Sequence, residues 1–217
     1  MAVDVTPRKP HATIARFDPS HFTIRPATPS RWPDIERLFG ERGACGGCWC
    51  MAWRLRHRDW VAGKGAGNKR AMKKIVTTGG RPGIIGYVGR EPVAWCAVAP
   101  REQYSHLGRS RVLKPVDEQP VWSVSCLFVL RPYRRHGISV LMLTGAIEFA
   151  RKAGATILEG YPVVPTMERT PDAFIWTGVP SSFLEAGFHE VARRSDTRPI
   201  MRASVAANRA PRRAAKR

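Results

Sequence analysis

The side chains best suited to chemistry gather in a short basic turn. Residues 127–130 are apolar, residues 134–136 read Arg-Arg-His, Gly137 follows them, and helical spacing of apolar residues starts at Ile138. The first backbone N–H groups of a helix have no intrahelical partner, and that end of the helix carries a partial positive charge. A basic, glycine-containing turn before a helix therefore predicts a binding site for an anion such as phosphate.

The rest of the sequence predicts the elements that position this turn. Apolar and alternating runs indicate strands at residues 21–27, 83–88, 93–99, 121–129, 156–163, 189–194 and 199–201. Helical spacing indicates a helix capped by Ser30 and further helices over residues 68–76, 138–152 and 181–187. Residues 89–92 should close a hairpin, and residues 101–120 should form a long charged loop. The strand, helix and strand between residues 121 and 163 form a crossover unit, which predicts two parallel strands.

Three short motifs resemble one enzyme family. Residues 134–139, Arg-x-x-Gly-x-Ser, resemble the Arg/Gln-x-x-Gly-x-Gly/Ala pyrophosphate loop of the GCN5-related N-acetyltransferases (GNAT). Residues 127–129, Leu-x-Val, resemble the acetyl-CoA strand of that family, and residues 187–188 match the Gly-Phe that follows its last helix. Two positions depart from the pattern, because Ser139 stands where the family prefers Gly or Ala and Arg135 stands where a first Gly is common.

The resemblance implies a fold as well as a loop. The order of predicted elements over residues 21–202 is that of the GNAT fold. It implies the α/β class (an α+β mixed sheet): a single GNAT-like domain with a central mixed β-sheet flanked by helices and a parallel strand pair around a crossover helix. Residues 1–20 are expected to form a flexible N-terminal arm, and residues 203–217, with five basic residues and no acid, a basic disordered tail.

Activity and cofactor follow from the resemblance. It implies direct transfer of an acetyl group from acetyl-CoA to a primary amine of a small molecule, without a covalent enzyme intermediate. By the same resemblance, the cofactor-binding residues are Leu127, Phe128, Val129, Arg134, Arg135, His136, Gly137, Ile138 and Ser139. The first three should line the thioester and pantetheine arm, and the remainder the pyrophosphate.

The catalytic residues are less well marked. Family members often carry a tyrosine at the position of Phe183, which has no hydroxyl, so Tyr161 and Ser182 are the candidate acids. Glu159 is the candidate base because the end of a crossover strand faces the cleft in open parallel sheets. The alternative for Glu159 is an ion pair with one of the many arginines. Cys126 is expected to be a core residue rather than a nucleophile.

A cysteine-rich segment at residues 45–54 has two interpretations. Its three cysteines, together with His57, could hold zinc, but a structural zinc site usually pairs two separated ligand couples, so no metal is expected. Alternatively, Trp49, Trp53 and Arg54 form a wall for the acceptor. The tryptophans could also be simple core residues.

Composition restricts the remaining possibilities. The net charge of +19 suits polyanionic partners, so the alternative function is a basic nucleic-acid- or protein-binding module with the GNAT fold and little or no catalysis. Nucleic acid could bind through the basic tail, but it is not the favoured partner. The sequence shows no signal peptide and no apolar run that could span a membrane, so a cytoplasmic protein with reduced cysteines is expected. The sequence does not decide whether the protein forms a homodimer.

Overall fold

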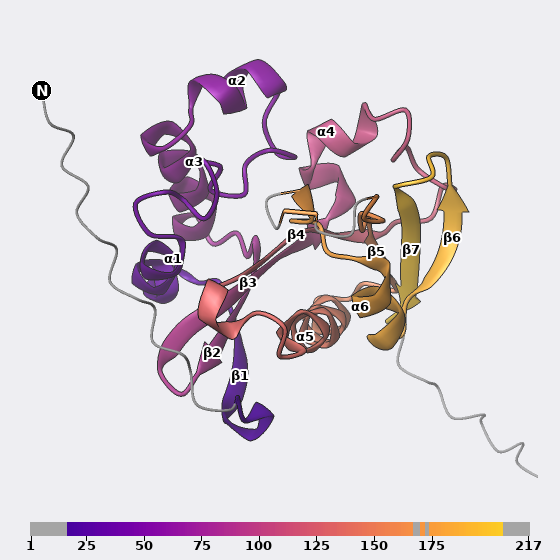
Figure 1. Ribbon diagram of the computed structural model, residues 1–217. Helices are drawn as coiled ribbons and strands as arrows, with labels where there is room; N and C mark the ends of the chain where they lie inside the picture. Colours follow the sequence, from indigo (N-terminus) through magenta and orange to yellow (C-terminus); the bar gives the residue numbers. More distant parts are fainter. Residues whose placement is uncertain (1–16, 167–169, 172–173, 206–217) are drawn as a thin grey trace, which may run out of the picture.

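The computed structural model describes residues 17–166, 170–171 and 174–205. Its centre is a seven-stranded mixed sheet in the order β1-β2-β3-β4-β5-β7-β6 (Figure 1). The strands are β1 (Phe22–Pro26), β2 (Gly83–Val88), β3 (Glu91–Pro100), β4 (Trp122–Val129), β5 (Ile157–Gly160), β6 (His189–Arg193) and β7 (Pro199–Ser204). Neighbouring strands are antiparallel except β4 and β5, which are parallel as predicted.

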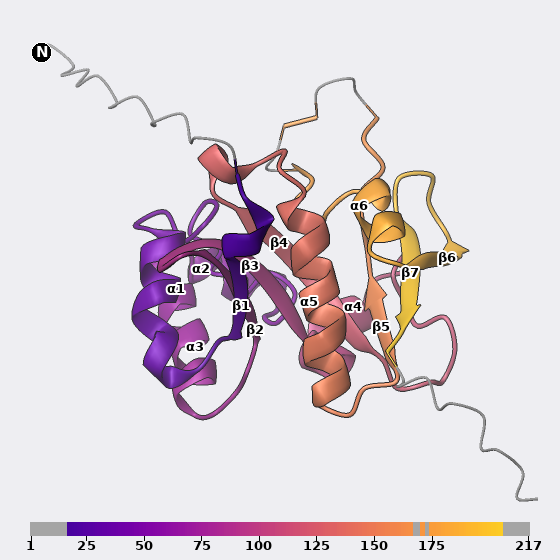
Figure 2. The same ribbon diagram turned by 90° about the horizontal axis from the view of Figure 1, so that it is seen from below.

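Helices cover both faces of this sheet. They are α1 (Trp32–Phe39), α2 (His57–Ala62), α3 (Ala66–Thr77), α4 (Ser105–Gly108), α5 (Ile138–Lys152) and α6 (Pro180–Glu185). Short 3₁₀ turns are η1 (Pro19–His21), η2 (Pro29–Arg31), η3 (Arg101–Gln103) and η4 (Arg131–Tyr133). Figure 2 shows α5, the crossover helix, lying across the sheet with α6 beside it. The predicted class, an α/β mixed sheet flanked by helices, is confirmed.

Strand β3 shows how the two faces divide. Ala94, Cys96 and Val98 pack against α5, whereas Trp95 and Ala97 pack with α1 and α3 on the opposite face. Successive side chains of a strand point to opposite faces, so a strand covered on both sides is apolar throughout. This explains why residues 93–99 of β3 form one uninterrupted apolar run.

The parallel pair is short. Its register joins Trp122 to Leu158 and ends where Val124 faces Gly160. Strand β4 then continues to Val129, beyond its last partner in β5. The sheet therefore opens into a wedge beside the second half of β4, and the basic turn follows directly from that half.

Several predicted details need correction. Ser30 lies inside η2, and Arg31 is the N-cap of α1, because Pro29 starts a 3₁₀ turn before the helix. The expected loop over residues 101–120 contains η3 and α4. The hairpin connection is shorter than residues 89–92, because Glu91 already pairs with Val88.

The predicted termini are only partly described. Strand β7 continues to Ser204 and Val205 is buried, so the boundary at residue 203 falls inside the last strand. The rest of the predicted arm and tail, residues 1–16 and 206–217, lies outside the described residues. Among the described helices, none is long and apolar enough to cross a membrane.

Candidate active site

The basic turn has the features of an anion site. Gly137, the N-cap of α5, has φ 73°, and Arg135 has φ 63°. Left-handed backbone is easy for glycine and uncommon for other residues, so the turn needs Gly137 for its shape. The first turn of α5 carries no acidic residue and Gly137 makes no side-chain cap. The backbone N–H groups of this first helical turn, with exposed Arg135 and His136 beside them, suit an anionic pyrophosphate.

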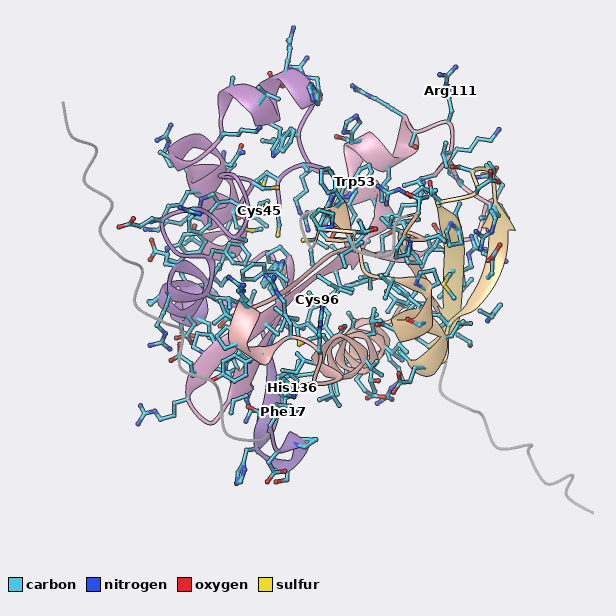
Figure 3. The ribbon with its side chains drawn as sticks, in the orientation of Figure 1. Phe17, Cys45, Trp53, Cys96, Arg111 and His136 are labelled. Carbon is cyan, nitrogen blue, oxygen red and sulfur yellow. The ribbon has the colours of Figure 1, made fainter. Side chains whose placement is uncertain are left out.

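Two contacts fix the turn in place. The Nε of Arg134 donates a hydrogen bond to the carbonyl oxygen of Val129 at 2.8 Å, which ties the turn to the end of β4. The ring of His136 packs against Phe17, with 5.9 Å between centroids (Figure 3). The structure therefore places the predicted loop residues directly after the predicted acetyl-CoA strand.

The edge of β4 in the wedge already has a partner. The backbone N–H of Leu127 donates to the carbonyl oxygen of Trp176 at 2.7 Å. Leu127 was expected to line the thioester arm together with Phe128 and Val129, both of which are partly buried here. Trp176 was not predicted at this position, because residues 164–179 show no strand or helix periodicity.

Glu159 lies at the centre of a buried polar network. Its side chain is fully buried, and Oε1 accepts hydrogen bonds from Arg101 Nη1 at 2.9 Å and from the Tyr161 hydroxyl at 2.7 Å. Its other oxygen, Oε2, accepts from Arg202 Nε at 2.8 Å. Arg202 continues to Asp117 at 2.6 Å. This arrangement matches the ion pair that was the alternative for Glu159, and a role as base stays a prediction.

Tyr161 connects that carboxylate to β4. Its hydroxyl lies 2.8 Å from Ser123 Oγ and also accepts from Arg101. Burial, followed by the neighbouring Glu159 carboxylate, raises the pKa of Tyr161 well above its usual range. The phenol is therefore protonated at neutral pH and donates to Glu159.

Beside this network is a pocket of about 330 Å³. Arg101, Tyr104, Asp117, Glu159 and Arg202 are among the residues that line it. The pocket lies beside the start of β4, because Val121, which immediately precedes that strand, also lines it. The basic turn follows the other end of the same strand.

Ser182 lies apart from the other two catalytic candidates. It is in α6, where the neighbouring Phe183 belongs to the core cluster around α5. The Tyr161 ring belongs to a cluster on the opposite face of the sheet. The structure thus brings Glu159 and Tyr161 together and leaves Ser182 on the α5 side.

The cysteine-rich turn is held by backbone contacts. Gly47 approaches Gly65 so closely that an added Cβ would lie 2.4 Å from the Gly65 nitrogen. Buried Asn68 donates to the Gly47 carbonyl oxygen at 3.1 Å. Trp49 and Cys50 have φ of 47° and 54°, a strained conformation for residues other than glycine. These contacts explain how a turn of unusual shape persists.

Its cysteines separate rather than converge. Cys45 is exposed, whereas Cys50 is buried with its Sγ 3.5 Å from Sγ of Cys126, which is also buried as expected for a core residue. The contact with Cys126 and burial raise the pKa of the Cys50 thiol well above its usual range. Metal ligation requires the thiolate. In the part of the chain that the structure describes, no three His, Cys, Asp or Glu side chains are grouped to hold a metal.

The three predicted acceptor residues occupy two places. Trp49 is buried, where it stacks on Trp32 and packs against Phe39. Trp53 lies near α4, its ring 5.8 Å from His106 and 5.7 Å from Trp176 (Figure 3). Trp49 thus fits the core interpretation, and Trp53 lies beside the wedge.

Arg54 is a cation without an acidic partner among the described residues. Its guanidinium donates to Gln103 Oε1 at 3.1 Å and to the Tyr104 hydroxyl at 3.3 Å, both neutral groups. It also lies over the Tyr104 ring, 4.5 Å from the centroid. The neighbouring Trp53 has a buried indole N–H without a hydrogen-bond partner in the same described part. The positive charge of Arg54 is therefore not balanced by an acidic side chain of the described residues.

Sequence reasoning missed most of the polar network. Arg101, Ser123 and Arg202 were not among the candidates, and their partners lie far away in the sequence. One signal was present, because Ser123 and Arg202 are polar residues inside otherwise apolar strands. Such residues usually have a hydrogen-bond partner when they are buried.

A mixed sheet that opens at its parallel pair, with a basic helix start beyond the opening, defines a known class of acyltransferase fold. The chain belongs to the acetyltransferase (GNAT) family, whose model matches residues 49–164, more than half of the chain. The family resemblance predicted from the sequence is thereby confirmed. Membership also agrees with acetyl-CoA as the acyl donor.

Solved structures share the fold at low sequence identity. A GNAT acetyltransferase from Listeria monocytogenes 4b F2365 is 8% identical, with a TM-score of 0.51, and covers 84% of this chain and 94% of its own. One from Streptococcus agalactiae 2603 is 15% identical, with a TM-score of 0.50 and coverage of 84% and 95%. The yncA protein of Salmonella typhimurium, solved with its cofactor acetyl-CoA, is 12% identical, with a TM-score of 0.48 and coverage of 88% and 98%. No curated protein matches the chain.

Proposed function

We propose that this protein is an N-acetyltransferase that moves an acetyl group from acetyl-CoA to the primary amine of a small molecule that also carries an anionic group. The observation that carries the proposal is the basic turn at the start of α5, placed directly after β4 in a chain of the GNAT family. A helix start without acidic residues is suited to a phosphate group. When bound, acetyl-CoA supplies an acetyl group activated as a thioester.

The residues of the turn have separate roles in binding the donor. Arg135 and His136 give exposed side-chain donors for the pyrophosphate, and residues 137–139 give the backbone N–H groups of the helix start. Arg134 keeps the turn on the end of β4 through its hydrogen bond to Val129. Leu127 and the two residues after it line the thioester arm.

Glu159 and Tyr161 are our candidates for proton transfer. The acceptor amine must lose a proton before it attacks, and the departing thiolate benefits from one. Hydrogen bonds of 2.8 and 2.7 Å connect Ser123 to Tyr161 and Tyr161 to Glu159. The three side chains therefore form a chain of hydrogen bonds along which a proton can be transferred. Ser182, on the other side of the sheet, is the second candidate for the acid.

Arg54 and Trp53 support an anionic acceptor. A half-buried guanidinium whose described partners are neutral can still form a charge-assisted hydrogen bond to a carboxylate or phosphate. The neighbouring Trp53 adds an aromatic ring beside this cation, and its buried indole N–H has no hydrogen-bond partner among the described residues. The acceptor class we propose is therefore an amine with a carboxylate or phosphate group.

Replacing Arg54 tests this recognition. We expect Arg54→Gln to raise the KM for an anionic amine by about tenfold or more, since a hydrogen bond to a charged group is worth about 1.5–3 kcal/mol. The affinity for acetyl-CoA should be little changed. The measurement is an acceptor array in which release of the CoA thiol is followed, with acetyl-CoA affinity measured by calorimetry.

Arg58→Gln is the matched control. Arg58 lies four residues after Arg54, in α2, where its side chain is highly exposed and pairs with Asp59 at the surface. An Arg54→Gln variant with an unchanged KM for every anionic acceptor contradicts the acceptor class. If no amine in the array is acetylated and the protein is retained on DNA in a salt-sensitive way, the binding-module alternative replaces the enzyme.

A further inference from the structure

A short segment of the chain fills the wedge between β4 and the end of β5. We call residues 174–178 the strap. On one side, the Leu127 N–H of β4 donates to the Trp176 carbonyl oxygen at 2.7 Å. On the other side, the N–H of Val163, three residues beyond β5, donates to the Gly178 carbonyl oxygen at 2.9 Å. The strap thus bridges the two strands where their own pairing has ended at Val124 and Gly160.

Hydrogen bonds and ring packing hold the strap. Thr177 is fully buried, and its hydroxyl accepts a hydrogen bond from Arg198 Nη1 at 3.1 Å. The Trp176 ring packs against Trp53, with 5.7 Å between centroids. Phe174, at the start of the strap, is 65% exposed. Each of these hydrogen bonds contributes modestly to stability, and segments held in this way open locally at a lower cost than the core of a sheet.

The strap and the donor need the same backbone group. The Leu127 N–H is part of the strand edge that we assign to the thioester arm, and it is already bonded to Trp176. A backbone amide has one hydrogen to donate, so a second acceptor at full strength has to replace the first. The two occupants of this edge therefore exclude each other.

We propose that the strap is a displaceable plug, which closes the thioester edge of β4 in the free protein and leaves it when acetyl-CoA binds. This inference rests on the proposed donor site. Release of Trp176 also uncovers the face of Trp53, one of the two acceptor residues proposed above. The strap therefore also covers part of the acceptor side until the donor is in place.

Weakening the strap should tighten donor binding. Displacing the strap opposes acetyl-CoA binding, so a strap that is less firmly held raises the population of competent protein. We expect Thr177→Val, which removes the hydroxyl bonded to Arg198, to lower the Kd for acetyl-CoA by about three- to tenfold in calorimetry. Thr144→Val is the matched control, because the Thr144 hydroxyl is exposed and bonds within α5. Its Kd should equal that of the unmodified protein.

Hydrogen exchange of the unmodified protein gives an independent test. Saturation with acetyl-CoA should increase deuterium uptake in residues 174–180, while the peptide over residues 134–140 becomes more protected. Unchanged or lower uptake in the strap with the donor bound, or an unchanged Kd in Thr177→Val, overturns the plug and leaves the donor site intact. If acetyl-CoA binds neither the unmodified protein nor the variants, both the donor site and the plug are wrong.

Discussion

Glu159→Gln is expected to lower the free energy of unfolding by about 3–5 kcal/mol, because it removes the charge from a buried ionic network. The side chains of Arg101 and Arg202 are only 12% and 9% exposed and would face a neutral amide in place of the carboxylate. One end of that amide is itself a donor and would oppose the guanidinium groups. Urea denaturation followed by circular dichroism measures the change.

Glu148→Gln is the control for this prediction. Glu148 pairs with Arg151 on the exposed side of α5, at 2.6 Å, and both side chains are well exposed. Exposed pairs contribute little, so the control should leave the unfolding free energy nearly unchanged. Equal stability losses in both variants would show that the network around Glu159 does not hold the strands together.

The same variant separates the two roles considered for Glu159. A general base contributes about 10²–10⁴-fold to the rate, so loss of a base lowers kcat far more than the folded fraction falls. A purely structural ion pair leaves the kcat of the folded fraction nearly unchanged. Activity measured well below the melting temperature, corrected for the folded fraction, decides between them.

Local signals account for the parts of the fold that the sequence predicted well. The strand before the basic turn, the stripe of α5 and the strand after it are each encoded within a few residues, by apolar periodicity and by glycine. The connection rule for crossover units then makes β4 and β5 parallel without further information. For this reason the basic turn could be predicted with its residues and its place after β4, while its role in binding an anion stays a prediction.

Long-range partners account for what the sequence did not predict. Glu159 bonds to Arg101 across 58 positions and to Arg202 across 43, and nothing near any one of them indicates the others. Cys50, one of the candidate metal ligands, contacts Cys126, which is 76 positions away in the sequence, and it is buried in the core. The strap is a similar case, since Trp176 contributes a carbonyl oxygen, and any residue at that position would carry the same group.

Gly137→Val is expected to weaken acetyl-CoA binding by at least tenfold. Gly137 holds φ at 73°, and a β-branched residue there strains the turn and places a side chain where a pyrophosphate must approach the backbone. Among the described residues, an added Cβ would meet no atom within 4 Å, so the first carbon of the new side chain has room there. The expected loss is therefore one of ligand binding rather than of packing. Calorimetry with acetyl-CoA measures it.

Gly154 provides a control with the same strain at the other end of the same helix. It follows α5, its φ is 86°, and an added Cβ would likewise meet nothing within 4 Å in the part of the chain that the structure describes. Gly154→Val should therefore reduce stability about as much as Gly137→Val, by about 1–3 kcal/mol, while leaving the Kd for acetyl-CoA unchanged. Equal affinities in the two variants would mean that the donor does not use the start of α5. A selective loss at Gly137 would separate the anion site from the strain of a left-handed residue, because both variants carry that strain and only one lies at the positive end of the helix dipole.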